Sequence, residues 1–387
     1  MKKTITIVTG TRAEFGLLKP VISEFLKLNN VDLKIVATGM HLHEHFGFTY
    51  REIEQEGFPI HKKIDIITDI FTPVGILNNI SITIKKFSEY FSNFKPDILV
   101  LLGDRYETFA VATVAAVLNI PIAHLYGGDT TEGATDEFFR HSITKMSCLH
   151  FVSCEQSRKR VIQLGENPNC IFNVGSLGVE NILTTKLLGK EELEHSIGFN
   201  LGEKYSIVTF HPVTLENINI AIQFQELLDA IDEFKDMKFI FTKANSDANG
   251  NIINNMIDEY VSKNKKMTVA FKSLGLLRYL SAMKHCKLVI GNSSSGIYEA
   301  PSLNVVTIDI GDRQKGRTRA ESVINCQPYK AEIVKAINAG LTKNVKNIEN
   351  PYFQPNTSST IVKTIINVLE KGNISLKKRF YDCECNI

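Results

Sequence analysis

The stretch DILVLLGD (97–104) holds five consecutive apolar residues and ends in a glycine and an acid. An unbroken apolar run of this length is typical of a strand in a parallel sheet whose two faces are both covered by helices. Similar runs occupy 4–10, 33–39, 121–128, 149–154, 171–176, 205–211, 238–242, 267–271, 287–292 and 305–311. Longer helical patterns separate them, so the sequence predicts alternating strands and helices.

The length of 387 residues is too great for one ordinary core and predicts two domains. About six strands precede a boundary near 180–204, and about five follow it. We therefore expect two doubly wound Rossmann-like α/β domains, residues 1–180 and 181–358. A single (β/α)₈ barrel is the competing architecture, but it would leave strands over.

The composition excludes several classes of protein. Apolar residues make up 43% and charged residues 22%, as in an ordinary globular protein, and 44 basic against 42 acidic residues argue against a nucleic-acid partner. No apolar run approaches the ~18–20 residues of a membrane span, and the N-terminus does not resemble a secretory signal. The seven scattered cysteines predict free thiols in a reducing cytoplasm. We expect a cytoplasmic protein with no membrane partner.

Polar residues follow most of the predicted strands. Ligands of open parallel sheets bind beyond the carboxyl ends of the strands. Those ends carry TGTR, TGMH, GDRYE, GGD, FHP, GNSSSG and GDRQKGR. Seven such endings predict one large polar cleft between two facing domains.

The segment GNSSSGIYE (291–299) predicts a phosphate site, because small residues open a helix whose free N–H groups favour an anion. The alternative is an ordinary serine cap. The pattern is neither GxGxxG nor GxxxxGK[ST], which argues against nicotinamide cofactors and P-loop hydrolysis. Glu299 could accept the hydroxyls of a ribose. In GDRQKGRTR (311–319), Arg313 and Arg317 suit a diphosphate, whereas Lys315 and Arg319 are expected to be surface residues.

Three aspartates stand out as candidates for proton transfer. Asp104 ends the predicted strand 97–104, and Asp129 follows GG at the end of another strand. Asp136 precedes a predicted helix in GGDTTEGATDEFFRHS (127–142), where Glu132 and Glu137 are expected to be solvated acids near the helix start. Asp136–Arg140 and Glu137–His141 would be i,i+4 pairs.

Two histidines at strand ends are weaker candidates. His211 ends the first strand of the second domain, and the structural and the catalytic interpretation are equally favoured. His41 begins HLHEH (41–45), directly after a strand. A metal site is disfavoured there, because the spacing is not HExxH and no cysteine or aspartate accompanies it.

The set of motifs resembles the hydrolysing UDP-N-acetylglucosamine 2-epimerases, from residue 4 to about residue 325. The motifs are TGTRAEFG (9–16), ATGMHL (37–42), LGDRYE (102–107), GGDTTEGATDEFFRHSITK (127–145), FHPVT (210–214) and GNSSSGIYE…GDRQKGR (291–317). This resemblance implies a GT-B fold in which a C-terminal helix and tail, residues 359–387, cross back to the first domain. It further implies a homodimer or homotetramer that needs neither a metal nor a nicotinamide cofactor.

The resemblance also implies the reaction, which releases UDP from UDP-N-acetylglucosamine and inverts C2 to give N-acetylmannosamine for sialic acid. Asp104, Asp129 and Asp136 would be the acid/base residues, with His211 near the leaving phosphate or the sugar. The residues expected to bind substrate and UDP are Arg12, His41, Arg105, Ser294, Ser295, Gly296, Glu299, Arg313 and Arg317.

One departure from the family leaves the substrate open. Many members have GGE where this chain has GGD, so the Asp129 carboxylate is one methylene shorter. Three interpretations are open: the sugar sits deeper, Asp129 only positions other groups while Asp136 does more of the proton transfer, or the substrate is a UDP- or GDP-2,4-diacetamido-2,4,6-trideoxy sugar. Non-hydrolysing epimerases typically have an EAG-type turn here. A GT-B glycosyltransferase and a non-catalytic nucleotide-sugar binding protein are the alternatives of other classes.

Overall fold

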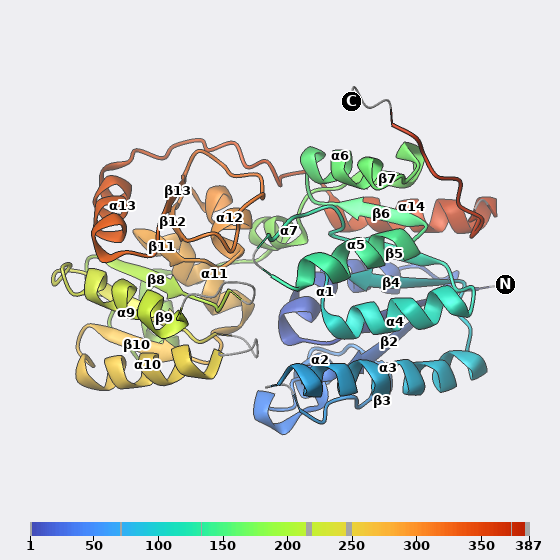
Figure 1. The fold of residues 1–387 in the computed structure, drawn as a ribbon, viewed down its shortest axis with the longest axis horizontal. Coiled ribbons are helices and arrows are strands. Elements are labelled where there is room, and N and C mark those ends of the chain that lie inside the picture. Colours follow the sequence, from blue (N-terminus) through green and yellow to red (C-terminus); the bar gives the residue numbers. More distant parts are fainter. Residues whose placement is uncertain are drawn as a thin grey trace. The chain divides into compact units, whose positions relative to one another are not determined.

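The computed structural model describes residues 2–69, 72–132, 134–213, 219–244, 250–372 and 374–383. The chain forms two compact units, each built on its own sheet (Figure 1). The first unit comprises Met1–Asp129, Asp136–Glu180 and Tyr352–Ile387, and the second comprises Thr130–Thr135 and Asn181–Pro351. The prediction of two doubly wound parallel sheets is confirmed, and a barrel is excluded.

The first unit contains a seven-stranded parallel sheet in the order β3-β2-β1-β4-β5-β6-β7. Its strands are β1 (Lys3–Thr9), β2 (Val31–Thr38), β3 (Ile60–Ile64), β4 (Ile98–Leu102), β5 (Ile122–Leu125), β6 (Leu149–Val152) and β7 (Ile171–Asn173). The strand order reverses between β1 and β4. The carboxyl ends of these two strands are therefore where a ligand is expected in such a sheet.

Helices join these strands. They are α1 (Arg12–Leu26), α2 (Tyr50–Gln55), α3 (Pro73–Asn93), α4 (Tyr106–Val117), α5 (Asp136–Met146), α6 (Glu155–Gln163) and α7 (Leu177–Thr184), with short 3₁₀ turns η1 (Gly39–Leu42), η2 (Glu44–Phe46) and η3 (Pro168–Cys170). The last helix, α14 (Thr357–Lys371), packs against α1. Its Ile361 and Ile365 join the core that contains Leu18 and Phe25. The predicted return of the C-terminal helix to the first unit is thus confirmed.

The second unit contains a six-stranded parallel sheet in the order β10-β9-β8-β11-β12-β13. The strands are β8 (Tyr205–Thr209), β9 (Lys238–Thr242), β10 (Thr268–Phe271), β11 (Leu288–Gly291), β12 (Val306–Ile310) and β13 (Val323–Cys326). Its helices are α8 (Lys190–Ile197), α9 (Ile220–Ile231), α10 (Gly250–Lys263), α11 (Gly275–His285), α12 (Ser295–Tyr298) and α13 (Lys330–Thr342), with the 3₁₀ turn η4 (Ala300–Leu303). Here the order reverses between β8 and β11.

Strand β4 shows why continuous apolar runs form these sheets. Ile98, Val100 and Leu102 belong to the hydrophobic core on one face of the first sheet. Leu99 and Leu101 belong to the core on the other face. Successive side chains of a strand point to opposite faces, so a sheet covered by helices on both sides needs every position to be apolar.

The two strands that the sequence did not predict are both edge strands. β3 has the sequence IHKKI, and its three central side chains are exposed. β13 has the sequence VINC, with only its last residue buried. Edge strands pack on fewer neighbours and commonly carry charged residues, so their sequences lack the continuous apolar signal of interior strands.

Candidate active site

The carboxyl end of β4 presents Asp104 to a buried arginine. Arg140, on α5, is 1% exposed, and its Nε donates to Oδ2 of Asp104 at 2.9 Å. Its Nη2 also donates to the same oxygen. A guanidinium pair of this kind fixes the carboxylate and stabilises its charged form, which can accept a proton. The predicted residue Asp104 is thus held in one orientation at the switch point of the first sheet.

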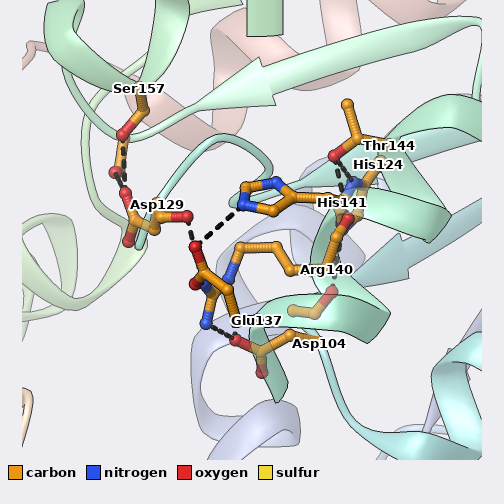
Figure 2. Close-up of polar contacts among 10 residues, drawn as sticks. Asp104, His124, Asp129, Glu137, Arg140, His141, Thr144 and Ser157 are labelled. Carbon is orange, nitrogen blue, oxygen red and sulfur yellow. Dashed lines mark hydrogen bonds and ion pairs between the residues drawn. The ribbon is translucent and has the colours of Figure 1, made fainter. Parts of the chain in front are cut away.

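Arg140 extends this contact into a network (Figure 2). Its Nη1 donates to Oε2 of Glu137 at 2.7 Å, and His141 Nε2 lies 2.9 Å from the other oxygen, Oε1. The predicted Glu137–His141 pair is confirmed. The expectation that Glu137 is merely a solvated acid is wrong, because its side chain is only 19% exposed and joins two partners. Glu132, in contrast, is 55% exposed.

Asp129 lies in the same region but is held by hydroxyl groups. Its Oδ1 accepts from Ser157 Oγ at 2.6 Å and from Ser153 Oγ at 3.2 Å (Figure 2), and the residue is 4% exposed. Its carbonyl oxygen accepts from Arg140 Nη1 at 3.0 Å. Asp136, the first residue of α5, is partly buried one position before Glu137. The three predicted aspartates therefore gather around one end of α5 in the first unit.

The predicted cations of the first unit are engaged with acids. Arg12 Nε lies 2.7 Å from Glu52 Oε2 at the start of α1, and both side chains are well exposed. Arg105 Nε donates to Glu107 Oε1 at 2.6 Å. Both arginines lie next to the switch point, where the sequence placed them.

His41 is fully buried, unlike the ligand-facing residue that we predicted. One ring nitrogen lies 3.0 Å from Thr9 Oγ1, and the other lies 2.8 Å from Thr49 Oγ1. Burial lowers the pKa of His41 to about 4, so the imidazole is neutral. These bonds tie η1 to β1 and give His41 a structural role.

A pair of buried acids lies at the end of β1 and was not predicted from the sequence. Glu14 and Glu107 are 8% and 2% exposed. Burial, reinforced by the charge of Glu107, raises the pKa of Glu14 to about 8. The spacing Thr11-x-x-Glu14 is a capping-box signature, which could have revealed the hydrogen bonds of Glu14 but not its proximity to Glu107.

In the second unit, Asn292 links the residues that follow β8 and β11, where the strand order reverses. Its Oδ1 accepts from the N–H of His211 at 2.7 Å, and its Nδ2 donates to the carbonyl of His211 at 2.8 Å. Gly291 has a φ of +128°, and a Cβ there would lie 1.9 Å from the carbonyl oxygen of Thr209. Only glycine therefore allows β8 and β11 to approach here. His211 follows β8 and is 6% exposed.

The serines after β11 form a hydroxyl cluster. Ser295 Oγ lies 2.5 Å from Tyr279 OH and 3.1 Å from Ser293 Oγ. Ser294 is the cap residue of α12, which has only four residues. A Cβ on Gly296 would lie 2.6 Å from Thr307 Cγ2, so this glycine allows α12 to pack closely on β12.

In the arginine-rich segment after β12, Lys315 is a surface residue as predicted, whereas the same prediction for Arg319 is wrong, because it pairs with a buried acid. Arg313 Nη1 donates to the carbonyl of Asn292 at 3.1 Å. Among the described residues, Nε and Nη1 of Arg317 are buried without a hydrogen-bond partner, and the guanidinium lies over the ring of Tyr298 at 5.3 Å. Arg319 instead pairs with buried Asp309 at 2.7 Å, and Lys315 is 56% exposed. Buried N–H groups without acceptors are unfavourable, so these two nitrogens of Arg317 are the feature of the segment that its own contacts do not explain.

Glu299 lies close enough to be influenced by Arg317. Burial raises the pKa of Glu299 to about 8, although its own backbone N–H and Arg317 oppose the shift. A protonated carboxyl can both donate and accept hydrogen bonds at neutral pH. Such a group suits a ligand that carries hydroxyls.

In the segments that the structure describes, no group of three or more histidine, cysteine, aspartate and glutamate side chains is arranged to hold a metal ion. Nor does any helix there combine the length and the apolar character that crossing a membrane requires.

These features define an α/β protein of the GT-B type, with acids at the edge of one sheet and buried arginine N–H groups at the edge of the other. The family model for UDP-N-acetylglucosamine 2-epimerases matches residues 24–366, and the chain belongs to this family. It is 42% identical to the polysialic acid biosynthesis protein P7 of Escherichia coli over 99% of this chain and 98% of that protein.

A second relative is the GDP/UDP-N,N'-diacetylbacillosamine 2-epimerase (hydrolyzing) of Campylobacter jejuni, 44% identical over 84% of this chain and 85% of that protein. The crystal structure of Methanocaldococcus jannaschii UDP-GlcNAc 2-epimerase in complex with UDP-GlcNAc and UDP is similar with a TM-score of 0.78. It covers 94% of this chain and 99% of that chain at 21% identity, which supports the fold.

Proposed function

We propose that this protein is a hydrolysing UDP-N-acetylglucosamine 2-epimerase that converts UDP-N-acetylglucosamine and water into N-acetylmannosamine and UDP. The observation that carries the proposal is Asp104, fixed by buried Arg140 among two further aspartates at the edge of the first sheet. The product would supply sialic acid synthesis, in keeping with the relative named for polysialic acid biosynthesis.

The reaction needs proton transfers at C2 on both faces of the sugar. In the first step a base removes the C2 proton, the C2–H electron pair forms the C1=C2 double bond, and UDP leaves with the electrons of the C1–O bond. In the second step an acid delivers a proton to C2 from the other face, the C1=C2 electron pair forms the new C2–H bond, water adds to C1, and a carboxylate accepts the proton that this water loses. Carboxyl groups suit both tasks when their surroundings tune their proton affinity. We assign these transfers to Asp104, Asp129 and Asp136 as a group.

Within this group, Asp129 is best suited to positioning. Two serine hydroxyls occupy one of its carboxylate oxygens, and its carbonyl helps to hold Arg140. Asp136 is the more accessible acid and would therefore carry more of the proton transfer together with Asp104.

The second unit supplies groups for UDP. The unpartnered N–H groups of Arg317 would bind the diphosphate, together with Arg313 and the serine hydroxyls. Neutral Glu299 would bind the ribose hydroxyls, and His211 would lie near the leaving phosphate. Arg12 and Arg105, at the edge of the first sheet, would attract the negative charge of a UDP-sugar.

A second substrate has its own support. The relative that is 44% identical acts, by its description, on N,N'-diacetylbacillosamine nucleotides and is hydrolyzing. The shorter Asp129, drawn back onto Ser153 and Ser157, is compatible with a sugar that has a bulkier C4 substituent.

Incubation in D₂O tests both substrates and the reaction type. With UDP-N-acetylglucosamine and no acceptor, we expect UDP and N-acetylmannosamine that carries deuterium at C2, measured by NMR and mass spectrometry. Intact donor, or released N-acetylglucosamine without label, contradicts epimerisation. If only the diacetamido-trideoxy nucleotide is turned over, with the same labelling, the reaction stands and the substrate changes. Reversible formation of an unhydrolysed UDP-sugar epimer would contradict the hydrolysing reaction.

A further inference from the structure

Two buried acidic side chains lie close together at the end of β1. A Cβ on Gly10 would lie 2.8 Å from Oε1 of Glu107 and 3.2 Å from Oε2 of Glu14. Glu14 comes from α1 and Glu107 from α4, and both are almost completely buried. Neither residue belongs to the proton-transfer or UDP-binding groups assigned above.

Glu14 fixes the turn that follows β1. Its Oε2 accepts from the N–H of Gly10 at 2.6 Å and from the N–H of Thr11 at 3.0 Å, while Thr11 Oγ1 accepts from the N–H of Glu14 at 3.2 Å. This reciprocal capping box sets the start of α1. The next residue of the turn is Arg12, so Glu14 sets the direction in which that arginine leaves the strand.

Glu107 fixes Arg105. Its Oε1 accepts from Arg105 Nε at 2.6 Å, and Arg105 Nη2 also contacts Met40 Sδ at 3.7 Å. The second oxygen of Glu107, Oε2, is buried and has no hydrogen-bond partner among the described residues. A buried carboxylate oxygen without a donor is unfavourable unless a proton lies close by.

The charges around the pair allow one anion and not two. Arg105 is the cation that contacts the pair, whereas Arg12 is paired with Glu52 on α2. His41, from η1, is neutral because burial lowers its pKa to about 4. Tyr106, from α4, is also neutral, since burial raises its pKa above the ordinary value. Two buried carboxylates beside one guanidinium repel each other, which favours a proton on one of them.

We propose that Glu14 and Glu107 form a one-proton pair that positions Arg105 and the Gly10–Arg12 turn for the UDP-sugar, without touching the substrate. The role in binding rests on the function proposed above. The proton is assigned to Glu14, because Arg105 donates to Glu107. The raised pKa of Glu14, about 8, agrees with this assignment. Above that pH both carboxyls are charged and compete for Arg105.

Infrared spectroscopy tests the pair without turnover. The C=O stretch of a protonated carboxyl would be followed against pH in a Glu299→Gln background, because that change removes another carboxyl with a pKa near 8. We expect a band that disappears around pH 8, is absent in Glu14→Gln, and persists in Glu180→Gln, a control that removes a partly buried acid whose pKa is also raised. In Glu107→Gln the band should disappear at a lower pH, because the like charge is gone. An unchanged midpoint in Glu107→Gln, or a persisting band in Glu14→Gln, overturns the pair.

Kinetics test the positioning role. From pH 7 to pH 9, loss of the Glu14 proton should lower kcat/KM about tenfold, mostly through KM, and Glu14→Gln should abolish that part of the fall. Glu107→Gln should raise KM more than it lowers kcat, because it releases Arg105. A pH profile of Glu14→Gln that matches the Glu180→Gln control contradicts the positioning role. If the wild-type protein turns over no UDP-sugar, the proposed function fails. The infrared titration still decides the pair, and UDP affinity measured against pH in the same variants decides the positioning.

Discussion

Arg140 in the first unit and Arg317 in the second both lie at the carboxyl edge of a parallel sheet, but their guanidinium groups have different surroundings. Arg140 donates to Asp104, Glu137 and the carbonyl of Asp129. Arg317 keeps Nε and Nη1 buried without an acceptor among the described residues. One arginine completes an internal network, while the other leaves a place for a ligand anion.

This difference matches the two tasks of the proposed reaction. Proton transfer requires carboxyl groups whose positions are fixed before the substrate arrives, and internal ion pairs supply that order. Binding a diphosphate requires N–H donors that the protein does not already satisfy. In the proposed reaction, the acids around Arg140 are therefore fixed by ion pairs within the first unit. The N–H donors of Arg317 in the second unit would instead bind the negative charge of the ligand.

The largest effect is expected from a substitution among the acids that surround Arg140 at the edge of the first sheet. Asp104→Asn should lower kcat by roughly 10²–10⁴-fold, because the amide cannot accept the proton although it can still contact Arg140. UDP affinity, measured by calorimetry, should change less than about threefold, since Asp104 is not among the residues assigned to UDP binding. Asp97→Asn, which alters an exposed acid before the other end of β4, is the matched control and should leave kcat unchanged. An unchanged kcat in Asp104→Asn would remove this residue from the chemistry.

A substitution of Arg317 at the edge of the second sheet should instead affect UDP affinity more than kcat. Arg317→Ala should weaken UDP binding by roughly 10- to 100-fold, the range expected for one charge-assisted hydrogen-bonding group. At saturating substrate, kcat should fall much less. If kcat falls as far as in Asp104→Asn while UDP affinity is retained, Arg317 acts in the chemistry and the contrast between the two edges is lost.

The interior strands of both sheets followed from the sequence, whereas two of the four edge strands, β3 and β13, did not. The run 98–102 was recognisable because both faces of β4 are buried. β3 and β13 were not, since their exposed side chains remove the apolar signal. The sequence thus predicted that each sheet is parallel and doubly wound but missed the outermost strand on one side of each sheet.

The candidate site shows a similar limit. Residues directly after strands, such as Asp104 and Arg317, were found because parallel sheets bring strand ends together. Glu137 was misjudged because its spacing fits a solvated helix start, and only the fold places Arg140 and His141 around it. Glu14 and Glu107 are 93 residues apart along the chain, so their shared space was not visible from either segment.

A smaller effect concerns the pH dependence of stability in the second unit. Burial raises the pKa of Glu299 from 4.5 to about 8, so the folded protein keeps a proton that the unfolded chain releases between these values. The free energy of unfolding should therefore fall as pH rises from about 4.5 to 8, by up to about 1.4 kcal/mol per pH unit for this group, and level off above pH 8.

Denaturant unfolding at several pH values checks this expectation. Glu299→Gln should show a shallower fall than the wild type over that window. Some slope should remain, because Glu14 also has a raised pKa. Equal slopes in the two proteins would mean that Glu299 is charged in the folded state, and its assignment as a neutral partner of ribose hydroxyls would then be wrong.

The smallest effect should come from the cation that lies two positions before Arg317. Lys315 is 56% exposed and lies 3.6 Å from Glu132 and 3.9 Å from Asp312, so water already solvates its charge. Exposed ion pairs contribute little, and Lys315→Ala should change UDP affinity by less than about twofold, measured beside Arg317→Ala. Both variants remove one positive charge from the same segment. A difference between their losses of UDP affinity therefore reports the effect of burial rather than that of net charge. Equal losses of affinity would show that UDP responds to the overall charge of the segment, and the unsatisfied donors of Arg317 would no longer explain the site.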